Sequence, residues 1–183
     1  GGVTGEAQKG IQAEDCVNIV IGLGGTGKFC VRMVKRYAYE RLRLNDDDIN
    51  GEFKHIRFFA VDTDFNNQSE EQEKVAYLRS LTTDDEEIDI DVSSALQHMG
   101  REPWNDWWFL GDSDSTQPLG NGAGGERRLG RLYLSYAAQK VKNKISSASQ
   151  RATENINTDT ANIYFHIVSG MGGGTGSGTF IDM

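Results

Sequence analysis

The chain has 183 residues, and its 19 lysines and arginines stand against 27 aspartates and glutamates, which gives a net charge of -8 and a pI near 4.9. This length predicts one domain, or most of one, with enough chain to bury a core. An acidic chain lacks the positive surface that nucleic acids require, so we expect no DNA or RNA partner.

No apolar run reaches the roughly 20 residues of a membrane-spanning helix, and the polar segment 1–15 lacks the pattern of a signal peptide. We therefore expect no membrane span and a cytoplasmic protein, in which Cys16 and Cys30 remain thiols. Segment 1–15 is expected to be a disordered or loosely docked arm. The three histidines are isolated in the sequence, and no transition-metal site is predicted.

The first predicted strand, residues 17–21, is a β-branched run that leads into the loop Gly22-Leu23-Gly24-Gly25-Thr26-Gly27-Lys28. Glycines between a strand and a helix are typical of a phosphate-binding turn, because backbone N–H groups and the helix dipole point at the anion. In the helix that follows, helical spacing predicts a buried apolar face and a solvated basic face. The apolar residues are Cys30, Met33, Val34, Tyr37, Ala38 and Leu42, and the basic residues are Arg32, Lys35, Arg36 and Arg43.

The second predicted strand, residues 56–61, ends in Asp62-Thr63-Asp64. A strand, a helix and a second strand form a βαβ unit, which closes right-handed and brings the carboxyl ends of its parallel strands to one edge. Asp62 and Asp64 should therefore face the same crevice as the first glycine loop. Either carboxylate can also cap a helix, and the two roles are compatible.

The stretch that follows, up to residue 119, is less regular. Its acidic run over residues 84–91 predicts a solvated loop. Trp104, Trp107 and Trp108 form an aromatic cluster that is either a satellite core beneath an insertion or a surface for a protein partner. The sequence leaves both interpretations open.

Two more glycine-rich stretches follow. Residues 120–125 precede a helix predicted over 126–149, and the run Gly-Met-Gly-Gly-Gly-Thr-Gly-Ser-Gly at 170–178 lies between a strand at 162–169 and a helix expected to start at Thr179. A flexible linker is disfavoured for that run, because linkers rarely follow an apolar strand directly. Three such loops suit a triphosphate with magnesium better than a dinucleotide, which needs one.

These elements predict an α/β fold, with a Rossmann-like parallel sheet, helices on both of its faces and the glycine loops at the carboxyl ends of the strands. The run at 170–178 is similar to the signature loop of the tubulin and FtsZ superfamily of GTPases. Residues 22–27 resemble its first nucleotide loop, residues 60–64 the end of its second strand, and residues 120–131 its γ-phosphate loop with the helix behind it. The four stretches stand in the family's order, and the bacterial tubulin-like proteins are the branch most similar to this chain.

The resemblance implies the strand order 3-2-1-4. It also implies that residues 16–183 form the N-terminal part of a GTP-binding domain, with an enlarged insertion at about 65–118. GTP or GDP with magnesium would be the cofactors. The nucleotide-binding residues implied are Gly24, Gly25, Thr26, Lys28, Ala123, Gly124, Gly125, Gly172, Gly173, Gly174, Thr175 and Gly176.

Within that set, the first glycine loop would lie along the α- and β-phosphates, residues 123–125 would close on the γ-phosphate, and residues 172–176 would wrap the phosphates from the other side. Asp64 would approach the magnesium ion through water, with Asp62 beside it. The family often has asparagine close to the position of Lys28, which would instead add a point charge near phosphate.

The function expected from the resemblance is a filament-forming GTPase that associates with copies of itself. In the family, hydrolysis needs an acidic loop from the neighbouring subunit, and we expect the corresponding segment to lie beyond Met183. No residue of this chain is therefore predicted to be catalytic, and turnover is expected only when that C-terminal half and a neighbouring subunit are present.

Three other functions can be weighed against the sequence. The first is a tubulin-like scaffold that binds nucleotide without turnover. The second is an NAD-binding Rossmann oxidoreductase, which the glycines at 22–27 alone would fit but which explains neither later loop. A phosphate-loop NTPase is disfavoured, because Phe29 occupies the position where those enzymes place a hydroxyl on magnesium.

Overall fold

The structure of the chain is a computed structural model, and it describes residues 16–43, 55–65, 79–81, 85–90, 123, 127–154 and 162–183. Four parallel strands form one sheet in the order β3-β2-β1-β4. The strands are β1 (Cys16–Leu23), β2 (Ile56–Asp62), β3 (Glu87–Asp89) and β4 (Asn162–Ser169). The predicted α/β fold class and the implied order 3-2-1-4 are both confirmed.

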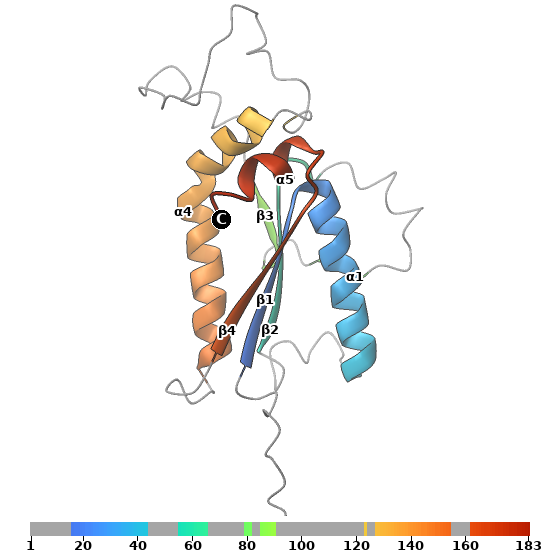
Figure 1. Cartoon of the computed structure of the whole chain (residues 1–183). Coiled ribbons are helices and arrows are strands. Elements are labelled where there is room, and N and C mark those ends of the chain that lie inside the picture. The colour runs from blue at the N-terminus through green and yellow to red at the C-terminus, as the bar shows by residue number, and fades with distance from the viewer. Residues whose placement is uncertain are drawn as a thin grey trace, which may run out of the picture.

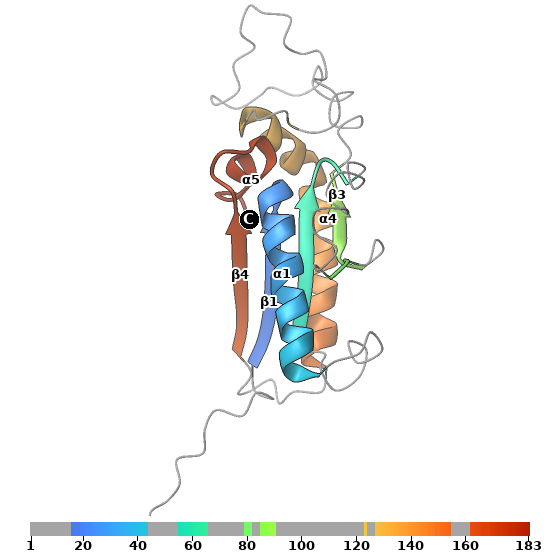
Figure 2. The same ribbon diagram turned by 90° about the vertical axis from the view of Figure 1, so that its right-hand side faces the viewer.

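Helices lie on both faces of this sheet, although most residues of β4 remain exposed. Helix α1 (Gly24–Leu42) lies on one face and α4 (Arg127–Thr153) on the other, as the two views in Figures 1 and 2 show. The short helix α5 (Gly174–Thr179) lies beyond the carboxyl ends of the strands and contacts both longer helices. In the part of the chain that the structure describes, no helix has the length and apolar character to cross a membrane.

Strand β1 is the centre of the core. Its residues Ile19 and Leu23 pack into the apolar cluster beneath α4, and Val20 packs into a second cluster beneath α1. A parallel strand that is covered on both faces needs a nearly continuous apolar sequence, and this explains the β-branched run. Cys16 and Cys30 are both free thiols.

The face of α1 that is buried differs from the prediction. The predicted apolar face is largely exposed, and Tyr37 retains 67% of its accessible surface. Lys35, predicted on the solvated face, retains only 2%. The buried positions recur every three or four residues and are Lys28, Val31, Lys35 and Tyr39. Two lysines can lie on this face because each ammonium group has hydrogen-bond or ion-pair partners inside the fold, which offset the cost of burying the charge.

The acidic run at 84–91 is not a solvated loop, because it contains strand β3. Ile88 and Ile90 are fully buried beside β2, and the Ile90 N–H donates to the Asp62 carbonyl at 2.9 Å. The alternation of isoleucine with carboxylates, in Glu87-Ile88-Asp89-Ile90, is the strand signal that the high charge obscured. The tryptophan cluster at 104–108 and its suggested partner role lie outside the described residues.

The last part of the chain forms β4 and α5. Strand β4 has the predicted bounds and pairs with β1 along its whole length, from Cys16↔Asn162 to Leu23↔Ser169. The helix expected to start at Thr179 instead ends there, since α5 begins at Gly174. Sequence propensity strongly disfavours a helix in Gly-Thr-Gly-Ser-Gly-Thr, so packing must supply its stability. That packing is on α4, where a Cβ at Gly130 would overlap the Gly174 carbonyl.

Candidate functional site

The residues predicted as the first glycine loop form the end of β1 and the first turn of α1, and they meet the glycine run at 170–178 at the carboxyl ends of β1 and β4, which are neighbours in the sheet. Gly24 has a φ of 70°, in the left-handed region that favours glycine. A Cβ on Gly24 would also lie 2.8 Å from the Gly176 nitrogen. The two loops are therefore in backbone contact at these glycines.

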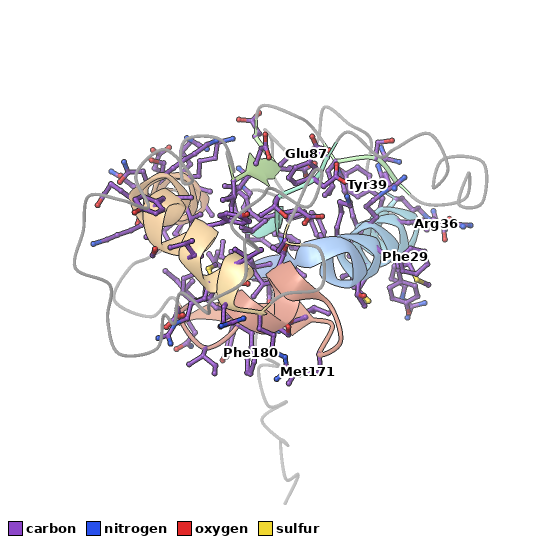
Figure 3. The ribbon with its side chains drawn as sticks, turned by 90° about the horizontal axis from the view of Figure 1, so that it is seen from above. Phe29, Arg36, Tyr39, Glu87, Met171 and Phe180 are labelled. Atoms are coloured by element: carbon purple, nitrogen blue, oxygen red, sulfur yellow. The ribbon has the colours of Figure 1, made fainter. Side chains whose placement is uncertain are left out.

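A second contact fixes the same two segments. A Cβ on Gly170 would lie 2.7 Å from the Thr26 Oγ1, so the side chain of Thr26 rests directly on the backbone that leaves β4. Figure 3 looks along the strands onto this end of the molecule. In that view α5 lies between α1 and α4, and Met171 and Phe180 mark the side farther from Glu87 of β3. Residues 22–27 and 170–178 thus form one surface at one end of the sheet, which we call the glycine surface.

Three glycines on this surface have no packing role that the structure reveals. Gly25, Gly172 and Gly173 are exposed, and a Cβ on any of them would meet no atom of the described residues within 4 Å. Their φ angles also lie outside the left-handed region. Neither backbone conformation nor packing against the described chain therefore accounts for glycine at these positions, and each leaves room for another group to approach the backbone.

A buried ion pair lies directly behind the first loop. The Lys28 Nζ is 3.3 Å from the Asp62 Oδ2, and it donates a hydrogen bond to the Asp64 carbonyl at 3.1 Å. The same ammonium group lies 5.0 Å from the centre of the Phe65 ring. Burial raises the pKa of the Asp62 carboxyl, and the neighbouring Lys28 ammonium opposes that shift. The start of α1 is thus fastened to the end of β2.

A pair of threonines links the end of β2 to the glycine run. The Oγ1 atoms of Thr63 and Thr175 lie 2.8 Å apart, and both side chains are buried. The Thr63 N–H donates to the Asp62 Oδ1 at 2.8 Å, so the threonine pair and the Lys28–Asp62 ion pair belong to one network. Sequence reasoning did not single out Thr63. Its only signal was its position between two aspartates at the end of a strand.

The other predicted site residues have mixed placements. Gly174, Thr175 and Gly176 are buried in α5, and Asp64 is partly exposed next to the ion pair. Ala123 is buried in the core cluster with residues of α4, while Gly124 and Gly125 lie outside the described residues. Among the residues that are described, no three histidine, cysteine, aspartate or glutamate side chains form a metal-binding cluster.

Comparison with known proteins identifies the family. The family model described as tubulin like matches residues 19–183, which includes every glycine loop and all four strands apart from the start of β1. The chain therefore belongs to the tubulin-like family, and the resemblance to the tubulin and FtsZ superfamily is confirmed. A search of curated proteins found no match.

Proposed function

We propose that this chain binds GTP with magnesium at the surface where the first glycine loop meets the glycine run. The observation that carries the proposal is the set of three exposed glycines around the Gly24–Gly176 contact. Nothing in the described fold requires glycine at these three positions. Membership of the tubulin-like family, whose members usually bind GTP, supports the same assignment. Backbone N–H groups at two adjacent strand-to-helix turns are suited to a chain of phosphates.

In this proposal, Gly24, Gly25 and Thr26 line one side of the α- and β-phosphates. Residues 172–176 line the opposite side, with the Thr175 hydroxyl as a side-chain donor. Ala123, Gly124 and Gly125 would close on the γ-phosphate. The choice of guanine over adenine rests on the family alone.

The polar residues behind the loops would divide the remaining roles. Asp64 would bind the magnesium ion through water, because Mg²⁺ keeps several waters and takes one or two carboxylates together with phosphate oxygens. Asp62 is engaged by Lys28 and by the Thr63 N–H, so we assign it to holding the loop rather than the metal. The Lys28 ammonium would correspondingly balance Asp62 and contribute only long-range attraction to phosphate.

Isothermal titration of the chain with GTP, ATP and NAD, each with magnesium, tests this function. We expect binding of GTP in preference to NAD. Tight binding of NAD without binding of GTP would overturn the proposal in favour of a Rossmann oxidoreductase.

We further propose that the protein associates with copies of itself and that hydrolysis takes place at the contact between subunits. A scaffold that binds nucleotide without turnover is the competing function. Phosphate release measured against protein concentration separates the two, because activity per molecule rises with concentration when two subunits complete one site. Binding without release at every concentration would favour the scaffold, and release that stays constant per molecule on dilution would place a complete site in one chain.

A further inference from the structure

The buried hydroxyl of Thr175 has one hydrogen-bond partner among the described residues, the hydroxyl of Thr63 at 2.8 Å. A hydroxyl carries one hydrogen to donate and two lone pairs that accept. The direction of this bond therefore decides what Thr175 can do. If Thr175 donates to Thr63, its only hydrogen is consumed, whereas if Thr63 donates, the hydrogen of Thr175 is free.

An anion on the glycine surface determines that direction. Phosphate oxygens accept hydrogen bonds, so a phosphate beside Thr175 takes the Thr175 hydrogen and leaves its oxygen to accept from Thr63. Two hydroxyls that donate in series polarise one another, which strengthens the terminal bond. We propose that Thr63 is a positioning residue for the nucleotide: it donates to the Thr175 oxygen and so directs the Thr175 hydrogen at the phosphate chain. This inference rests on the proposed function.

Thr63 is held firmly enough for this role. Its side chain is buried, and its N–H donates to the Asp62 Oδ1, whose partner oxygen faces the Lys28 ammonium. The Asp62 carbonyl accepts a hydrogen bond from the N–H of Ile90, the residue that follows β3. The network therefore fixes Thr63 through both neighbouring segments, so its Oγ1 is already in place when a ligand arrives and only the hydroxyl hydrogen has to turn.

The test is a double-mutant cycle on the affinity for GTP with magnesium. Thr63→Val keeps the branched shape and removes the hydroxyl, and we expect it to weaken binding by about 3- to 10-fold, the range of one net hydrogen bond. Thr63→Ser keeps the donor and should bind within about twofold of the wild type. In a Thr175→Val background, Thr63→Val should cause no further loss, because the residue through which it acts no longer carries a hydroxyl.

Thr179→Val is the matched control. The Thr179 hydroxyl is also buried in α5, but it donates backward to the Thr175 carbonyl, and Thr179 is not among the residues proposed to bind nucleotide. Its removal should lower the stability of the fold while leaving GTP affinity within about twofold. A thermal unfolding curve for each variant separates stability from binding.

The outcomes distinguish this inference from the proposed function. If the wild type does not bind GTP, both fail. If the wild type binds and Thr63→Val binds equally well, or loses as much in the Thr175→Val background as alone, the positioning role is wrong and the nucleotide site stands. Should Thr63→Val not fold, Thr63→Cys takes its place, since a thiol of similar size is a poor donor and the same loss is expected.

Discussion

Lys35 of α1 and Glu86, which directly precedes β3, form a buried ion pair across 51 positions of the sequence. The Lys35 Nζ lies 2.6 Å from the Glu86 Oε2, and the two side chains retain 2% and 9% of their accessible surface. The same ammonium group donates to the Ser80 carbonyl at 2.9 Å. The Lys35 ammonium group therefore links α1 to both Ser80 and Glu86.

Breaking this pair should destabilise the fold strongly. Lys35→Met leaves the Glu86 carboxylate buried without its ammonium partner, and we expect the free energy of unfolding to fall by about 3–5 kcal/mol in urea denaturation. The double variant Lys35→Met with Glu86→Leu should recover most of this loss, because two apolar side chains can replace a buried pair. Losses that simply add in the double variant would contradict the pairing.

A surface pair on the same helix supplies the control. Arg36 and Glu40 are also 2.6 Å apart, but both side chains are exposed. Arg36→Met should therefore cost less than about 1 kcal/mol, since water and salt screen exposed charges. Figure 3 shows Arg36 on the outer side of α1, away from Glu87 of β3.

Gly173→Val tests the open side of the glycine surface. A Cβ at Gly173 meets no described atom within 4 Å, so the variant should fold, while its branched side chain should block the approach of phosphate. We expect GTP affinity to fall at least about tenfold, which corresponds to about 1.4 kcal/mol. Ala138→Val, on the exposed side of α4, is the matched control and should bind as the wild type does. Unchanged affinity in folded Gly173→Val would place the nucleotide elsewhere.

Asp64→Ala should weaken nucleotide binding mainly when magnesium is present. A carboxylate close to a triphosphate repels it unless a cation lies between them, so the wild-type side chain helps only through the metal. In EDTA the variant should bind GTP no worse than the wild type. Titration calorimetry with and without magnesium measures both arms, and an equal loss in both would make Asp64 a structural residue.

Tyr133 should make the fold sensitive to alkaline pH. Burial raises the pKa of its phenol above the ordinary value of 10.0, so the folded state holds this proton more tightly than the unfolded state. Its contribution to the free energy of unfolding is therefore constant below pH 10 and decreases as pH rises above it. Tyr133→Phe removes that decrease. Urea denaturation of both proteins should show their stabilities diverging in favour of the variant above about pH 10, whereas parallel profiles would contradict the assignment.

Much of the fold could be predicted because its signals are local. The strand over 162–169, the β-branched run of β1 and the glycines at the ends of these two strands are patterns of adjacent residues, and parallel topology then follows from the crossover rule. The meeting of the two glycine loops was predictable for the same reason, since parallel strands end at one edge of a sheet.

What could not be predicted depends on partners distant in the sequence. Lys35 can be buried because its ammonium group pairs with Glu86, and the residue spacing within α1 does not reveal that partner. Helix α5 forms against its own propensity because Gly178 and Gly130 allow its backbone to contact α4. Thr63 contacts Thr175 only because the end of β2 lies beside α5. Each of these features depends on a contact between segments that are distant in the sequence.

The pairing of β1 with β4 also sets the order of events during synthesis. The Asn18 Oδ1 and the His166 Nε2, 2.9 Å apart across these strands, are separated by 148 positions in the chain. At the usual rate of translation, β4 and the glycine run at 170–178 leave the ribosome on the order of ten seconds after β1. Until then the apolar edge of β1 has no neighbour on that side, and contacts of such long range form slowly. A nascent chain of this protein therefore carries an unfinished sheet edge for seconds, and this interval is when a chaperone is most useful to it.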